Sequence, residues 1–428
     1  MKTIVKYLLG ASILFLLAGC AANDAPWGGN DEPYDASSKG EAATGDYYTP
    51  TPSEDVSSED VSTKKTTNSD INQTSAQDNL PKSGQITCSA VDDNSNYTYW
   101  NELCFSTDYN NRNPVGFSRY VNSYDFNTKN RVELNIINGK NIKVSLKDAQ
   151  MQTYVDNFHK AYLFPTASAA SYEVEISYVD SNNQNQTIDK TVKDGDIIDL
   201  EQTFTTNTNM QIMFVIDATG SMGDELSYLK AEIDDIITKV KDANQTANIE
   251  LSILMYRDTT DEYLTRYSDF STDIEAQKAF LLEQTAKAGG DRPEAVDEAL
   301  SFAMEQQWNE NATKLLIHVA DAPAHDADVP RWNTAVLDAA SKGIKILTVG
   351  CSGIDKKTEY LFRSQSIITG GQYIYLTDDS KIGGSHLEAS TEHSVTVEYL
   401  NSCLVRLITG YFKGIHINPI PYHQDTKA

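Results

Sequence analysis

The sequence is poor in positive charge, in cysteine and in long apolar runs. Its 428 residues include 35 Lys and Arg against 61 Asp and Glu, which gives a formal net charge of −26. So strong a negative charge opposes contact with nucleic-acid phosphates, and we expect no nucleic-acid partner. The patterns G-x-S-x-G, H-E-x-x-H and G-x-x-x-x-G-K-[ST] are missing, so there is no signature of an α/β-hydrolase, a zinc protease or a P-loop protein. No two of the cysteines have C-x-x-C spacing, which gives little support to a zinc site or a thiol oxidoreductase.

The N-terminus has the features of a bacterial lipoprotein signal. Two lysines precede an apolar run at residues 7–18, which is shorter than the about 20 residues that span a bilayer. The run leads into Leu-Ala-Gly-Cys, which resembles a lipobox, so we expect residues 1–19 to be removed and Cys20 to be lipidated and to anchor the chain to the membrane. Ala21 after the cysteine favours the outer membrane of the cell envelope. An ordinary signal peptide with a chance cysteine is the alternative.

Residues 20–85 are predicted to form a disordered tether. Between residues 21 and 85 there are 12 acidic residues against 4 lysines, with many Ser, Thr, Asn and Gln. Such a segment cannot bury enough apolar surface to offset its chain entropy, and its like charges repel one another. The tether would therefore hold the folded part away from the membrane.

Four cysteines remain once Cys20 is set aside. Cys88, Cys104, Cys351 and Cys403 are an even number, which suits disulfides in an oxidising compartment. Four cysteines allow three pairings, and the sequence alone does not choose among them. We expect Cys88–Cys104 and Cys351–Cys403, because these bridges each stay within one predicted domain.

Residues 86–208 have the pattern of a small β-sandwich. Short runs of strand character are separated by Asn, Gly and Asp turns, at residues 131–137, 141–146, 172–179 and 186–192. The segment from Asp156 to Pro165 resembles the T-D-x-x-G-x-A-x-L-x-P turn of carboxypeptidase-regulatory-like domains, without the family glycine. We therefore expect an Ig-like or carboxypeptidase-regulatory-like spacer or accessory module.

A buried strand followed by oxygen-bearing side chains begins the next segment. Residues 210–216 are an apolar run of the kind found in parallel strands, and an amphipathic helical stretch follows at 226–240. Between them lie Asp217, Thr219 and Ser221, one carboxylate and two hydroxyls at alternate positions. Hard cations such as Mg²⁺ prefer oxygen ligands of this kind. Capping of the helix by Asp217 or Ser221 is the structural alternative.

The segment 209–412 resembles a von Willebrand factor A (VWA) domain. Its Asp217, Thr219 and Ser221 match the D-x-[ST]-x-S motif of the family's metal-ion-dependent adhesion site (MIDAS). Strand-like and helical runs alternate along the segment, which predicts an α/β fold with a doubly wound parallel sheet. Ligands of such sheets bind beyond the carboxyl ends of the strands. A short C-terminal tail, residues 413–428, would follow.

The resemblance adds two carboxylates to the predicted metal site. Asp321 follows the predicted strand at 314–320, and Asp291 lies in a glycine turn where many A domains supply a threonine. The motifs Ala-Gly-Gly-Asp-Arg-Pro-Glu and Asp-Ala-Pro-Ala-His each depart by one residue from the G-G-G-D-x-P-E and D-A-P-P-H of a bacterial subgroup. Asp258 and His325 are expected to support the ligands without touching the ion.

The resemblance implies a binding protein rather than an enzyme. The expected ion is Mg²⁺, or else Mn²⁺ or Ca²⁺, and a partner protein would complete its coordination with a carboxylate. A structural or assembly lipoprotein whose metal only stabilises the loops is the first alternative. A hydrolase that uses Ser221 is the second, and the lack of a nucleophile elbow argues against it.

Overall fold

The computed structural model describes residues 81–106, 116–147, 149, 151–203 and 208–422. The predicted signal peptide, Cys20 and almost all of the predicted tether lie outside these residues. Among the helices of the described residues, none combines the length and the apolar character that crossing a bilayer requires.

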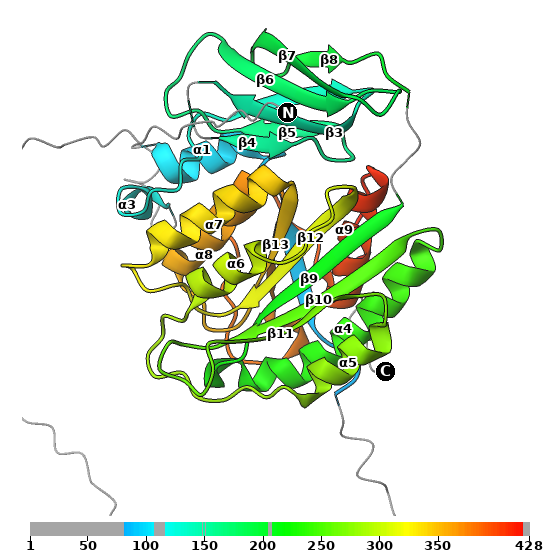
Figure 1. The fold of residues 1–428 in the computed structure, drawn as a ribbon. Helices are drawn as coiled ribbons and strands as arrows, with labels where there is room; N and C mark the ends of the chain where they lie inside the picture. The colour runs from blue at the N-terminus through cyan, green and yellow to red at the C-terminus, as the bar shows by residue number, and fades with distance from the viewer. Residues whose placement is uncertain (1–80, 107–115, 148, 150, 204–207, 423–428) are drawn as a thin grey trace, which may run out of the picture. The chain divides into compact units, whose positions relative to one another are not determined.

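A large sheet with helices on both faces forms the main α/β part of the molecule (Figure 1). Five neighbouring strands, β10, β9, β12, β13 and β14, run parallel, whereas β11, β1 and β15 join the two edges in antiparallel pairing. The strand order is β11-β10-β9-β12-β13-β14-β1-β15. Their bounds are β1 Thr87–Val91, β9 Asn209–Asp217, β10 Asn248–Tyr256, β11 Thr265–Ser271, β12 Ala312–Ala320, β13 Ile344–Gly350, β14 Tyr373–Leu376 and β15 Glu398–Tyr399. The predicted doubly wound sheet is thereby confirmed.

The apolar run of β9 is continuous because both faces of the sheet are covered. Ile212, Phe214 and Ile216 belong to the core that α4, α5 and α9 cover, whereas Met213 and Val215 belong to the core that α6, α7 and α8 cover. The bounds of these helices are α4 Gly223–Ala243, α5 Ile274–Glu283, α6 Val296–Met304, α7 Val329–Lys342, α8 Lys356–Thr369 and α9 Leu400–Lys413. Strand β9 thus lies at the buried centre of the sheet, and the loop with the D-x-T-x-S motif follows it directly.

Two smaller sheets form the β-rich module that the sequence predicts. One has the order β5-β2-β8 and the other the order β4-β3-β6-β7. The strands are β2 Val132–Ile137, β3 Lys140–Leu146, β4 Gln152–Tyr154, β5 Lys160–Leu163, β6 Tyr172–Val179, β7 Asn185–Val192 and β8 Ile197–Asp199. Two short helices, α1 Tyr97–Phe105 and α3 Ser118–Val121, precede them. Buried side chains such as Leu134, Val144 and Ile176 come from both sheets and share one core.

Strand β1 lies in the large sheet, although the sequence analysis places it within the β-rich segment 86–208. It pairs with β14 through Cys88–Leu376 and with β15 through Thr87–Tyr399. A strand of five residues shows its own apolar character in the sequence but not its distant partner, so its membership of this sheet was not predictable.

The predicted disulfides are not formed. Cys88, Cys104, Cys351 and Cys403 are all buried free thiols. The thiol of Cys88 neighbours that of Cys403 and not that of Cys104, and burial raises its pKa first, followed by this neighbouring thiol. The predicted pairing of Cys88 with Cys104 assumed that both cysteines lie in the β-rich segment. Because β1 belongs to the large sheet, that reason no longer holds.

A buried ion cluster holds helix α8 to the segment that follows β1. Arg363 is fully buried and donates to both carboxylate oxygens of Asp93, at 2.9 and 2.5 Å, and to Glu359 at 2.8 Å. The other oxygen of Glu359 accepts from Lys356 at 2.7 Å, so two cations face two carboxylates. Breaking such a cluster at one member leaves an uncompensated charge inside the protein.

We therefore predict that Asp93→Ala lowers the free energy of unfolding by about 3–5 kcal/mol. Urea denaturation followed by circular dichroism measures this change. Asp189→Ala, which removes an exposed ion pair with Lys147, is the control and should alter the transition little. Equal transitions for the two variants would contradict a stabilising role for the Arg363 cluster.

Candidate metal centre

The carboxyl end of β9 turns sharply into helix α4 and exposes no part of Asp217 to solvent. The turn is held by backbone hydrogen bonds from Ala218 to the Tyr256 carbonyl, at 2.8 Å, and from Gly220 to the Ala288 carbonyl, at 2.9 Å. A β-carbon at position 220 would lie 2.7 Å from that Ala288 oxygen, so only glycine fits there. The turn therefore brings the glycine loop, residues 287–291, against the end of β9.

The hydroxyls of the D-x-T-x-S motif lie next to the carboxylate of Asp217. Thr219 donates to Asp217 Oδ1 both from its backbone N–H, at 2.9 Å, and from its hydroxyl, at 2.7 Å. The Thr219 and Ser221 hydroxyl oxygens are 3.2 Å apart. The second oxygen of Asp217, Oδ2, is buried and has no hydrogen-bond partner.

Asp321 joins this group from the neighbouring strand. Strands β9 and β12 are paired in parallel, so their carboxyl ends lie side by side, and Asp321 follows the end of β12 directly. Asp321 lies close to the Ser221 hydroxyl and interacts with the charge of Asp217. Its Oδ1 is buried and has no hydrogen-bond partner. The structure thus brings together four of the five predicted ligands.

Glu294 is a member of the site that the sequence analysis missed. Its backbone N–H donates to the Pro323 carbonyl at 2.9 Å, which fixes it beside the loop after β12. A β-carbon at Gly289 would lie 3.1 Å from Glu294 Oε1 and 3.2 Å from the β-carbon of Thr219, so the glutamate lies close to the threonine. Its Oε2 is buried without a partner. The final residue of the Ala-Gly-Gly-Asp-Arg-Pro-Glu motif was the available signal. The oxygen cup is defined here as Asp217, Thr219, Ser221, Glu294 and Asp321.

The pKa values of the three carboxyl groups in the oxygen cup are higher than those of ordinary Asp and Glu side chains. Burial, together with the charge of Asp321, raises the pKa of Asp217 to about 7. Burial raises the pKa of Asp321 to about 6, against the opposing effect of Ser221. The pKa of Glu294 rises to about 9 because of burial and the charges of Asp217, Asp258 and Asp321. Each shift is caused first by burial of the carboxyl group and then by negative charge on its neighbours.

The nearby arginines make their hydrogen bonds outside the cup, although the charge of Arg292 opposes the rise in the pKa of Asp321. Arg257 donates to the carbonyls of Ala218 and Thr285, at 3.0 and 2.8 Å. Arg292 donates to Asp355 at 3.1 Å and to the Gly353 carbonyl at 3.0 Å. Three carboxylates with unpartnered oxygens and two hydroxyls form a donor set that fits a hard divalent cation such as Mg²⁺. Such an ion would be held by the oxygen cup and would supply the missing positive charge.

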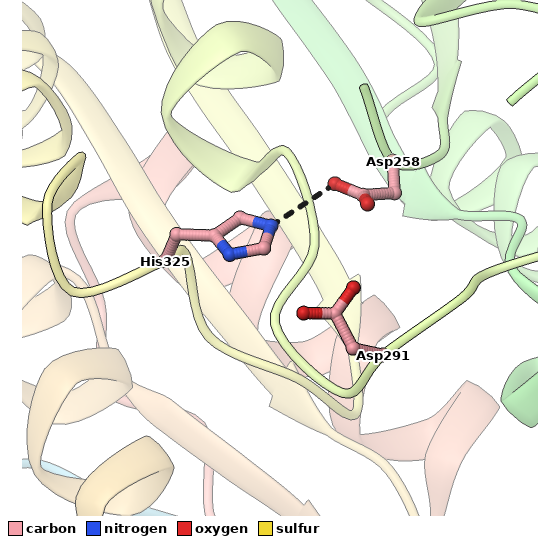
Figure 2. Close-up of side chains that lie close together, drawn as sticks. All are labelled: Asp258, Asp291 and His325. Carbon is pink, nitrogen blue, oxygen red and sulfur yellow. Dashed lines mark hydrogen bonds and ion pairs between the residues drawn. The ribbon is translucent and has the colours of Figure 1, made fainter. Parts of the chain in front are cut away.

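The structure places Asp291 outside the oxygen cup, with the two residues expected to support it. Asp258 follows β10, Asp291 lies in the glycine loop and His325 follows β12; Figure 2 shows their side chains turned toward one another. One ligand atom from each lies within 4.8 Å of the others. His325 Nε2 is 3.2 Å from Asp258 Oδ1. We call these three residues the loop trio.

A cavity of about 260 Å³ opens beside both groups. Its lining includes Ser221 and Asp321 of the oxygen cup and Asp291 of the loop trio, along with Gly289 and Glu294. Ser221 and Asp291 are solvent-exposed, whereas Asp217 and Thr219 are fully buried. A molecule in the cavity would therefore meet the cup from its open side.

Residues 211–378 match the family model of the von Willebrand factor A domain. This range includes every residue of the oxygen cup and of the loop trio. This part of the chain therefore resembles a VWA domain and lies within the segment 209–412 for which the sequence suggests that resemblance. Strands β1 and β15 and helix α9, which belong to the same α/β part, lie outside the matched residues.

Similar proteins match this chain over part of its length. The alpha-protein kinase vwkA of Dictyostelium discoideum is 27% identical over 171 residues, which are 40% of this chain and 27% of that protein. Among solved structures, the conserved hypothetical protein BatB from Bacteroides thetaiotaomicron has 15% identity and a TM-score of 0.27, over 50% of this chain and 91% of that one. The pilus adhesin SpaC from Lactobacillus rhamnosus GG has 11% identity and a TM-score of 0.33, over 51% of this chain and 32% of that one.

The raised pKa values predict how metal and pH act together on stability. The carboxyl groups of the cup have a higher pKa in the folded protein than in the unfolded protein, where it is about 4. In the absence of metal they therefore contribute fully to stability below about pH 4, and this contribution is lost as the pH rises through their pKa values in the folded protein. A cation binds the deprotonated form, so the increase in melting temperature caused by Mg²⁺ should grow from about pH 5 to about pH 8. Thermal denaturation with Mg²⁺ or with chelator measures this increase. Asp217→Asn should flatten its pH dependence, and an increase in wild type that does not vary with pH would contradict the assignment.

Proposed function

We propose that this chain is an envelope-anchored lipoprotein whose VWA domain holds a divalent cation in a MIDAS-type site and uses it to bind a protein partner. The supporting observation is the set of buried, unpartnered oxygens in the oxygen cup: Oδ2 of Asp217, Oδ1 of Asp321 and Oε2 of Glu294. Buried polar atoms are nearly always hydrogen-bonded in folded proteins. Three orphaned carboxylate oxygens at one point of a sheet are best explained by a cation that belongs there.

The ion would supply positive charge and a coordination position open to a partner. Ser221 and Thr219 would contribute hydroxyl oxygens, and the carboxylates would bind the ion directly or through water, as Mg²⁺ usually retains several waters. The cavity beside Ser221 and Asp321 leaves room for an incoming side chain. A carboxylate of the partner protein suits this position, because the bound cation would attract a negatively charged oxygen ligand.

The charge of the site makes such binding conditional on the metal. Without a cation, an acidic side chain would find no positive ion to bind and would be repelled by those carboxyl groups of the cup that are ionised. With the cation, the same side chain would bind to a positive centre. The proposal therefore requires partner binding to disappear on chelation rather than merely to weaken with salt.

The surroundings of Ser221 do not favour the alternative of a serine hydrolase. Its hydroxyl shares a contact with Thr219 and lies near Asp321, whereas an activated serine needs a neighbouring base such as histidine. The proposal is accordingly a binding protein without catalytic activity. Its location rests on the lipobox-like sequence before Cys20, which points to a lipid anchor in the bacterial envelope and, through Ala21, to the outer membrane.

We predict that Asp217→Ala lowers the affinity for Mg²⁺ or Mn²⁺ at least roughly tenfold, because it removes the buried carboxylate at the base of the cup. Isothermal titration calorimetry on the metal-stripped protein measures the affinity. Asp242→Ala, an exposed position on the same helix α4, is the matched control and should bind the ion as wild type does. Absence of binding by wild type would refute the metal site.

A pull-down from envelope extract, with and without EDTA, separates the binding role from a structural role. The proposal expects a protein that wild type and Asp242→Ala retain in Mg²⁺ and release on chelation, and that Asp217→Ala does not retain. If the ion binds but the retained proteins are the same with EDTA, the metal serves only to stabilise the loops.

We also predict that Cys20→Ala releases the protein from the membrane, because it removes the only attachment point for lipid in the proposed anchor. Membrane fractionation of cells that express each form measures the distribution, and metabolic labelling with a fatty acid checks the modification. The same membrane-bound fraction for both forms would contradict a lipid anchor at this residue.

A further inference from the structure

We propose that the loop trio, Asp258, Asp291 and His325, is a second metal site, separate from the oxygen cup and suited to a transition-metal ion such as Zn²⁺. Its side chains come from three different loops at the carboxyl edge of the sheet, and one ligand atom of each lies within 4.8 Å of the others (Figure 2). This inference does not require the cup to hold metal and goes beyond the proposed adhesion role.

The surrounding backbone positions the trio. The carboxylate of Asp261 accepts from the Asp258 N–H, at 3.2 Å, and from the Gly289 N–H, at 3.1 and 3.3 Å. One side chain thus fastens the turn after β10 to the glycine loop that carries Asp291. Gly289 has a φ of +78°, a conformation open to glycine at little cost. Asp261 therefore holds the loops of Asp258 and Asp291 close to each other, and His325 contacts Asp258 from a third loop.

An ion pair between His325 and Asp258 does not balance the charge at this edge. Asp258 is buried, with 3% of its surface exposed, and a protonated His325 would offset one carboxylate of the two in the trio. Glu294, whose buried Oε2 has no partner, lies close enough to Asp258 for their charges to interact. An ion in the cup would lie outside the trio, so Asp258 and Asp291 would still share a single imidazole.

The donor atoms distinguish the two sites. The oxygen cup offers only hydroxyl and carboxylate oxygens, which suit Mg²⁺, whereas the trio offers one imidazole nitrogen with two carboxylates. Imidazole favours ions such as Zn²⁺ and Co²⁺ over Mg²⁺. Three protein ligands leave a further position for water or an incoming group, as in zinc sites that are not purely structural. The exposure of Asp291 and the partial exposure of His325 give the ion a route from solvent.

The trio faces the space in which the proposed partner would bind. Asp291 lines the same cavity as Ser221 and Asp321. An ion at the trio would therefore place a second positive centre on the cavity, which a partner could reach separately from the cup.

The test uses Co²⁺ as the probe, because its visible absorption reports the replacement of water by protein ligands. We expect the metal-stripped Asp217→Asn protein, in which the cup is impaired, to bind Co²⁺ still. Adding His325→Gln to this variant should weaken Co²⁺ binding at least tenfold and remove the new absorption. Asp291→Asn, an exposed substitution with little risk to folding, should also weaken it. Competition with Zn²⁺ should displace the Co²⁺.

Two histidines elsewhere in the VWA region provide the controls. His393→Gln changes an exposed histidine that pairs only with Glu392 and should leave Co²⁺ binding unchanged. His386→Gln changes a histidine that contacts Glu225 and Asp378; loss of Co²⁺ there instead of at His325 would overturn the inference. So would absence of Co²⁺ binding by the Asp217→Asn protein, or equal affinity with and without His325. Failure of Mg²⁺ binding by wild type would refute the cup and leave this result unaffected.

Discussion

Buried negative charge at the carboxyl ends of β9 and β12 is the constraint on which the site depends. Asp217 has no exposed surface, and it interacts with the charges of Asp321 and Glu294 where burial raises the pKa of all three carboxyl groups. Isolated carboxylates are strongly disfavoured in such surroundings, so they must take up protons or gain a cation. The fold holds them together all the same, because the paired strands and the backbone bonds between their loops leave the side chains no other position. A cation bound at this position would reduce the repulsion among these three carboxylates.

The order of elements in the large sheet was predictable because burial leaves a direct record in the sequence. A strand covered on both faces, such as Met210–Ile216, is mostly apolar, and its one polar side chain, Gln211, is buried and hydrogen-bonded. An amphipathic helix follows it at a short distance. Strand β1 left no such record of its partners. It is short, it pairs with strands almost three hundred residues away, as in Cys88–Leu376, and antiparallel addition to an edge needs no special residues. The prediction of a Cys88–Cys104 bridge failed with it, since it depended on which sheet held Cys88.

The site was predictable to the extent that its residues follow strands directly. Asp217 and Asp321 are fixed by the ends of β9 and β12, and parallel pairing then brings them side by side. The glycine loop follows no strand, so its carboxylates had to be assigned by motif alone. Asp291 and Glu294 are three residues apart, and the choice between them depends on the path of the loop. The backbone hydrogen bond from Glu294 to Pro323 places the glutamate at the cup and leaves Asp291 beside Asp258. The spacing of these residues in the sequence does not predict this arrangement.

Two carboxylates of one motif thus serve two neighbouring groups of different chemistry. Glu294 completes a set of oxygen donors at a buried position, while Asp291 joins an imidazole at an exposed one. Because both groups border one cavity, a change in the glycine loop would alter them together. Asp261 fastens the glycine loop to the turn after β10, and the Glu294–Pro323 bond fixes the residues that follow the loop. The positions of both groups therefore depend on the path of residues 287–294.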